Sequence, residues 1–173
     1  LKRLLESKDG NARRAALTLA SALGNTDTPL HQNIAQSLSS KKLSEKALEA
    51  LVHLETSDPN SLIQMAEYLS GQAGTQAGKT VQRRRLEAAY LILSYLEIER
   101  LSGVLSERGA KLRKYYNEMP DELRYDSIER ASKQSLGVLS LEQLQKEYGL
   151  AQRPYESHCE STLKAVEEFL TVP

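Results

Sequence analysis

The sequence predicts an all-α protein, and three observations support that fold class. Leucine outnumbers valine and isoleucine together, and leucine favours helices whereas the β-branched residues favour strands. Apolar residues recur at helical spacing between capping residues and prolines. No segment has a convincing strand pattern. We therefore expect an array of short antiparallel helices, solenoid- or bundle-like, followed by a long helix or helical hairpin and a small helical C-terminal subdomain.

The charge balance argues against a dedicated nucleic-acid or membrane-surface domain. The 173 residues include 23 basic and 23 acidic side chains, so the formal net charge is zero. Domains of those two kinds usually carry a basic excess. No run of about 20 apolar residues is present, so we expect no membrane-spanning helix and no membrane partner.

The single cysteine and the first residue bear on location. Cys159 has no internal disulfide partner, which is typical of a reducing compartment, so we expect a cytoplasmic protein. The chain begins at Leu1 without methionine, which indicates a fragment or a trimmed product. An upstream targeting signal is compatible with that start.

Residues 1–70 are the first predicted unit, an array of short helices. Asp9 is the predicted N-cap of one helix, and Ser44 of another. Pro29 and Pro59 start two more, because proline is favoured in the first turn of a helix. The connections between these helices are short, and short connections favour antiparallel packing of neighbours.

An internal echo within this unit points to helical repeats. The segment DGNARRAA at residues 9–16 resembles the second helix of a HEAT-type repeat, and SEKAL at residues 44–48 follows about 35 residues later. The valine and the second arginine expected in such a helix are missing. The resemblance implies an α-solenoid or a curved bundle without assigning a family.

Residues 71–80 are predicted to be a flexible linker, because Gly71–Gly78 has the sequence GQAGTQAG. The stretch Ala73–Thr80 also fits a relaxed nucleotide-binding loop with alanine in place of the first glycine. That loop needs a strand before it and a parallel sheet around it. A helical pattern over Asn60–Ser70 precedes it instead, so the linker is the favoured interpretation.

Residues 81–119 are predicted to form a long amphipathic helix. Proline is absent from the span, and a continuous helix over it would be about 60 Å long. Gly103 and Gly109 each cost about 1 kcal/mol inside a helix, so a break near 103–109 into two antiparallel pieces is the alternative. A heptad stripe suited to coiled-coil packing runs along the span. It consists of Leu91, Ser94, Ile98, Leu101, Leu105, Arg108, Leu112, Tyr115 and Met119.

The densest basic cluster is Lys79 with Arg83, Arg84 and Arg85, at the start of this predicted helix. Positive charge there opposes the helix macrodipole by some tenths of a kcal/mol per residue. A phosphate group or an acidic partner would compensate the charge. The other interpretation is a solvated face paired with Glu87 at helical spacing.

Residues 120–173 are predicted to be a helical subdomain. Ser140–Gln143 is a capping box that starts a short helix, and Gly149 closes that helix. With the helix that follows, residues 140–160 are similar to a helix-turn-helix. Two glutamates on the second helix would face phosphates, which favours a plain helical corner over DNA binding.

The sequence predicts no catalytic, cofactor or metal site. His31, His53 and His158 are far apart in sequence, and the adjacent His158 and Cys159 point about 100° apart on a helix. His53 follows Glu49 by four residues, which is more typical of a hydrogen-bonded pair than of a metal site. No His/Cys/Asp cluster has zinc spacing. We expect a non-enzymatic protein without a cofactor.

The predicted function is protein binding or self-association by a helical scaffold, adaptor or assembly subunit. The alternative is a nucleic-acid-associated regulator that uses residues 79–85 and 140–160. Tyrosines gather in the C-terminal half, either at an interface or in place of the scarce phenylalanine in the core. The expected partner contacts are Leu91, Ile98, Leu101, Leu105, Leu112, Tyr115 and Tyr116. The expected contacts with phosphate or an acidic partner are Lys79, Arg83, Arg84 and Arg85.

Overall fold

The computed structural model describes residues 1–24, 27–72, 77–134 and 139–150, and every regular element in these ranges is helical. The all-α prediction is confirmed. Within the described residues no helix combines the length and apolar character needed to cross a bilayer. The helices are α1 (Lys2–Leu5), α2 (Gly10–Leu23), α3 (Thr28–Ala35), the 3₁₀ helix η1 (Gln36–Ser39), α4 (Ser44–His53), α5 (Pro59–Ser70), α6 (Lys79–Ser102), α7 (Glu107–Glu118), α8 (Asp121–Lys133) and α9 (Leu141–Glu147).

Local capping residues fix several helix starts as predicted. The Asp9 carboxylate accepts a hydrogen bond from the Asn11 amide at 3.0 Å, and the Asp58 carboxylate accepts one from the Ser61 amide at 2.8 Å. Ser140 begins α9 with a complete capping box. Ser44 differs from the prediction. It is the buried first residue of α4, and Leu43 occupies the N-cap position without a side-chain hydrogen bond.

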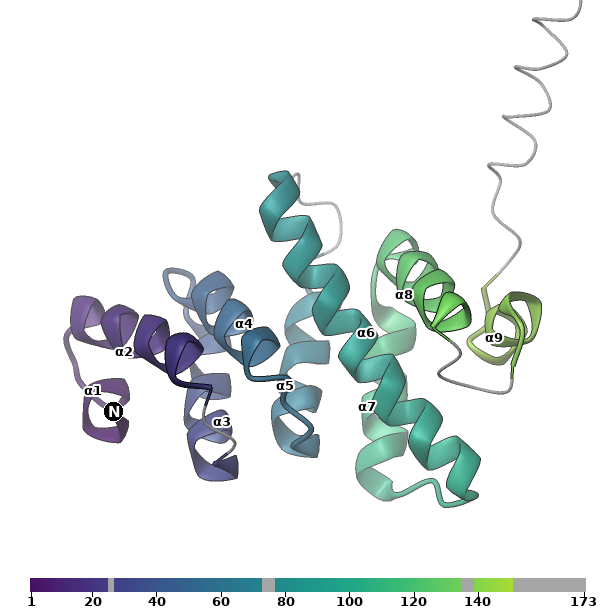
Figure 1. Ribbon diagram of the computed structural model, residues 1–173, viewed down its shortest axis with the longest axis horizontal. Coiled ribbons are helices and arrows are strands. Elements are labelled where there is room, and N and C mark those ends of the chain that lie inside the picture. The colour runs from purple at the N-terminus through teal and green to yellow at the C-terminus, as the bar shows by residue number, and fades with distance from the viewer. Residues whose placement is uncertain (25–26, 73–76, 135–138, 151–173) are drawn as a thin grey trace, which may run out of the picture.

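The helices form two rows along the long axis of the molecule (Figure 1). Helices α2, α4, α6 and α8 contact one another in order, and so do α1, α3, α5 and α7. The helices of the first row begin at residues 10, 44, 79 and 121, a recurrence of the kind seen in helical-repeat proteins. Contacts across the rows, such as those of α3 with α4 and of α5 with α6, enclose the core.

The core between the rows is aliphatic, because leucine supplies most of its large side chains. A buried leucine stabilises the fold by about 1.5–3 kcal/mol relative to an exposed one. Tyrosine replaces phenylalanine at one fully buried position, Tyr116. The other large side chains with almost no exposure are Leu17, Ile34, Leu48, Leu51, Leu62, Met65, Leu69, Ile92, Leu93, Leu112 and Ile128.

The segment 81–119 is a helical hairpin, so the prediction of a single continuous helix is wrong. α6 ends at Ser102, and Gly103 adopts φ 72°, a left-handed conformation that glycine tolerates at a helix C-terminus. α7 then begins with Ser106 as N-cap, whose hydroxyl accepts a hydrogen bond from the Gly109 amide at 2.9 Å. The heptad stripe is therefore not one continuous face.

The described part of the C-terminal region continues the array. α8 contacts α6, and α9 contacts α8. Gly149 follows α9 with φ 65°, as expected for a residue that closes a helix. The predicted second helix of the helix-turn-helix, with His158, Cys159 and the two glutamates, lies in residues 151–173, outside the described residues. Residues 73–76 of the predicted linker 71–80 lie outside them as well.

Candidate partner-binding corner

Four exposed apolar side chains gather where α6 turns into α7. We call this cluster the apolar corner. It consists of Ile98 (66% exposed), Leu101 (49%), Val104 (64%) and Leu105 (56%). Single exposed apolar residues are ordinary on protein surfaces, but a contiguous group marks an interaction site. Figure 1 shows this turn, between α6 and α7, at the lower edge of the molecule.

The turn that presents the apolar corner is held by Glu99. Its Oε1 accepts hydrogen bonds from the Tyr95 hydroxyl at 2.9 Å and from the Ser106 hydroxyl at 2.7 Å. Its carboxylate lies so close to Gly109 that a Cβ there would overlap it. Negative charge at the N-terminus of α7 is favourable, because the backbone amides point toward it. Glu99 thus links the last turns of α6 to the start of α7.

A recess of about 180 Å³ lies beside the apolar corner. Leu96, Leu105 and Tyr148 supply its apolar lining, and Arg100, Arg113 and Glu99 supply its polar lining. Pockets for drug-sized ligands are usually about 300–1,000 Å³. This recess is too small for such a ligand and has room for an inserted side chain of a partner.

The two arginines of the recess are held by ion pairs. Arg100 donates from Nε and Nη2 to the Glu97 carboxylate at 2.8–3.1 Å. Arg113 donates from Nη2 to the Glu147 carbonyl at 2.8 Å and to its carboxylate at 2.9 Å. These pairs orient both guanidinium groups before any partner arrives, which lowers the entropic cost of binding.

Tyr148 ties α9 to the back of the recess. Its hydroxyl donates to the Glu97 carboxylate at 2.7 Å, and Glu97 is 1% exposed. Burial and this hydrogen bond to Glu97 raise the pKa of Tyr148. The ring of Tyr148 packs edge-on against Tyr116 at 5.2 Å, and the Arg113 guanidinium lies 5.3 Å from its centroid. The wall of the recess is therefore a packed and hydrogen-bonded surface.

The predicted partner contacts do not all lie on the surface. Leu112 and Tyr116 are completely buried, so they are core residues and cannot contact a partner while this fold persists. The heptad stripe was predicted on a continuous helix that has no break after Ser102. In the structure the side of α7 that contains these two residues faces the core. Leu91 and Tyr115 are partly buried against the core. Val104 was not among the predicted contacts, since it lies off the heptad. The preceding glycine, Gly103, was the signal in the sequence that a turn could begin there.

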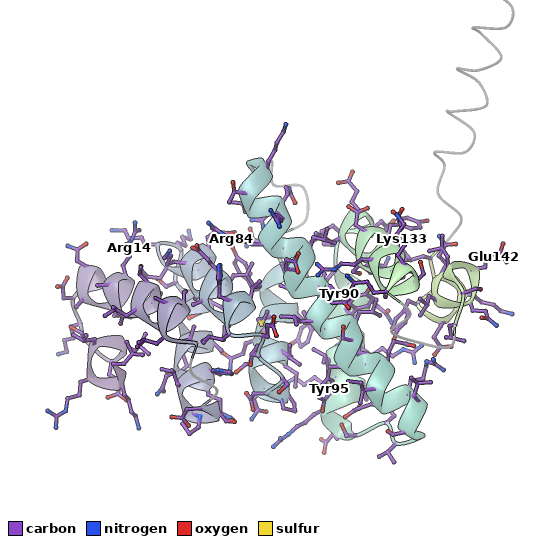
Figure 2. The ribbon with its side chains drawn as sticks, viewed as in Figure 1. Arg14, Arg84, Tyr90, Tyr95, Lys133 and Glu142 are labelled. Atoms are coloured by element: carbon purple, nitrogen blue, oxygen red, sulfur yellow. The ribbon has the colours of Figure 1, made fainter. Side chains whose placement is uncertain are left out.

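The basic cluster is divided by ion pairs with α4. Arg85 pairs with Glu45 at 2.8 Å, and Arg84 pairs with Glu49 at 3.4 Å. Figure 2 shows Arg84 extending from α6 over α4. Burial lowers the pKa of Arg85, but the hydrogen bond and charge of Glu45 outweigh it and raise the pKa. Half of the cluster therefore stabilises the contact between α4 and α6.

Lys79 and Arg83 remain exposed, and within the described residues neither forms an ion pair. The expected pairing with Glu87 is wrong, because Glu87 pairs with Arg130 of α8. Arg83 and Arg85 line a second recess of about 370 Å³ whose lining also includes Glu122 and Asp126. This mixture of charge does not favour a polyanion.

His31 and His53, the histidines within the described residues, each contact a polar group of the protein itself. The Nδ1 atom of His31 lies 2.9 Å from the Thr56 hydroxyl in the core. His53 Nδ1 lies 2.8 Å from the backbone carbonyl of Glu49, so the expected pair exists through the backbone. Among the described residues no three His, Cys, Asp or Glu side chains are grouped to hold a metal ion.

Comparison with known proteins assigns no family. The chain matches no protein-family model, no curated protein and no solved structure. The functional proposal therefore rests on the residues of the fold.

Proposed function

We propose that this chain is a non-enzymatic helical interaction module, acting as a scaffold, adaptor or assembly subunit, and that it binds a protein through the apolar corner. The observation that carries the proposal is that Ile98, Leu101, Val104 and Leu105, all within residues 98–105 around one turn, are about half exposed or more. A contiguous exposed group of this kind costs solubility unless it serves an interface.

The corner offers enough apolar surface to matter for binding. Covering the exposed part of each side chain contributes about 1 kcal/mol, given about 1.5–3 kcal/mol for complete burial of a large apolar side chain. The fixed turn at Glu99 and the preset arginines of the recess reduce the ordering cost of binding. These terms favour a protein partner that covers the corner and fills the recess together.

A matched pair of variants tests the proposal. Leu101→Asp with Leu105→Asp removes apolar surface from the corner, whereas Leu19→Asp with Leu23→Asp places the same change on α2, where these leucines are 48% and 67% exposed. Proteins of the source cell are captured with the wild type and both variants and quantified. Each enriched protein is then purified and titrated against all three chains.

The proposal predicts a protein whose Kd rises at least about tenfold with the corner variant and is unchanged with the α2 variant; tenfold corresponds to about 1.4 kcal/mol. Circular dichroism and urea unfolding confirm that both variants are folded. If every captured protein binds the corner variant as tightly as the wild type, the corner is not the interface.

A nucleic-acid-associated function has weaker support. Of the four cations predicted to contact phosphate, Lys79 and Arg83 are exposed, while Arg84 and Arg85 form ion pairs with α4. Binding to duplex DNA at about 50 mM salt, with a steep fall in affinity as salt rises, would support it. Absence of binding at that salt concentration dismisses it.

A further inference from the structure

The charges around the apolar corner indicate the chemistry of its partner. Arg108, Lys111 and Lys114 are exposed on α7, and none of them forms an ion pair within the described residues. Glu107 and Glu118 are the exposed anions of α7, Glu118 at the end of the helix away from the corner, and Glu99 is turned inward toward Ser106 and Tyr95. Arg108 lies in the first turn of α7, where a cation opposes the helix macrodipole. The exposed face of α7 thus has excess positive charge beside the corner.

The recess adds unused hydrogen-bond donors to that positive charge. Among the described residues Arg100 donates only from Nε and Nη2, and Arg113 only from Nη2. The Nη1 group of each guanidinium therefore has no acceptor within the described part of the chain. The two side chains are about 27% and 32% exposed, so a ligand can reach them. Among the side chains of a protein partner, a carboxylate is the acceptor that a guanidinium binds most strongly.

A second copy of this chain fits the corner poorly. In a two-fold dimer each patch meets its own counterpart, so the cations beside one corner would approach the same cations of the other. Like charges brought together at an interface oppose association. A partner with acidic residues removes this cost and compensates Arg108, Lys111 and Lys114.

A membrane surface also fits the corner less well than a peptide does. Tryptophan, which together with tyrosine anchors proteins at the bilayer interface, is absent from the chain, and the apolar corner contains no tyrosine. The recess is concave and sized for a side chain, whereas proteins bind a bilayer by inserting protruding apolar side chains into it. Its two oriented arginines suit acceptors at fixed positions.

We propose that the partner of the apolar corner is an acidic peptide segment with spaced apolar side chains, one of which enters the recess while neighbouring carboxylates contact Arg100, Arg113 and the cations of α7. The proposal rests on the protein-binding function proposed above and adds the class of partner. It is a form of helix-in-groove recognition, in which apolar anchors give affinity and charged residues give selectivity.

Synthetic peptides provide the test. One labelled peptide has leucines at helical spacing with glutamates between them, and a second has lysines in place of every glutamate. Vesicles with anionic lipid are the third probe. Fluorescence anisotropy and vesicle sedimentation measure binding to the full chain, to Leu101→Asp with Leu105→Asp, to Arg108→Glu with Lys111→Glu, and to the control Leu19→Asp with Leu23→Asp.

We expect saturable binding of the acidic peptide, about tenfold weaker for the corner variant and several-fold weaker for the charge-reversed variant, and unchanged for the control. Binding should weaken as salt rises. Equal affinity for the lysine peptide, or no effect of charge reversal, overturns the proposal. Binding to vesicles alone overturns it in favour of a membrane surface. If neither peptide binds while a captured protein still depends on the corner, the class of partner is wrong and the proposed function stands.

Discussion

The buried carboxylate of Glu97 gives a sharp prediction about how the recess is held. Its oxygens accept hydrogen bonds from Arg100 and from Tyr148, and it is 1% exposed. Replacing Arg100 with methionine would leave a buried charge with one hydrogen bond. Breaking a fully buried pair costs about 3–5 kcal/mol, and the partial exposure of Arg100 reduces the expected loss to about 2–3 kcal/mol.

Urea unfolding followed by circular dichroism measures this loss. The double variant Glu97→Gln with Arg100→Met removes both charges, so we expect it to lie within about 1 kcal/mol of the wild type. Measuring the single variant Glu97→Gln as well completes the double-mutant cycle, which gives the coupling energy of the pair. A loss below about 0.5 kcal/mol for Arg100→Met would refute the reasoning, because it would show that water already solvates the carboxylate.

Three further predictions concern the same region. The pKa of Tyr148 is raised in the folded state, so the protonated hydroxyl contributes fully to the free energy of unfolding below the unfolded pKa of about 10, and this contribution is lost as pH rises above it. Between pH 8 and pH 11 the free energy of unfolding should therefore fall by about 1 kcal/mol more in the wild type than in Tyr148→Phe. Leu112→Ala should cost about 2–5 kcal/mol and Leu105→Ala less than about 0.5 kcal/mol in urea unfolding, since one is buried and the other exposed. Alanine is favoured over glycine in a helix by about 1 kcal/mol, but Gly109→Ala should lower the unfolding temperature because the added Cβ displaces the Glu99 carboxylate. In a Glu99→Ala background, where that carboxylate is absent, the same change should raise the unfolding temperature.

The helices were predictable because their signals are local. Asp9, Asp58 and Ser140 cap helices within three residues of themselves, so sequence alone locates those starts. Helical periodicity is equally local, and the all-α class follows from it. The sequence also indicated that Gly103 was a point where the long span could break.

The site was only partly predictable, because it depends on long-range contacts. A heptad assigns Leu105 and Leu112 to one stripe, yet the break after Ser102 places one on the surface and the other in the core. Arg85 pairs with Glu45 across 40 positions, which no local pattern indicates. Exposed corners are therefore visible only after the helices have been packed.

The most direct test of the central claim is the Kd of a captured protein partner for Leu101→Asp with Leu105→Asp, measured with the unfolding free energy of the same variant. We expect at least about tenfold weaker binding with stability within about 0.5 kcal/mol of the wild type. Unchanged binding would contradict the claim. A loss of stability above about 2 kcal/mol would also contradict it, because the corner would then belong to the core.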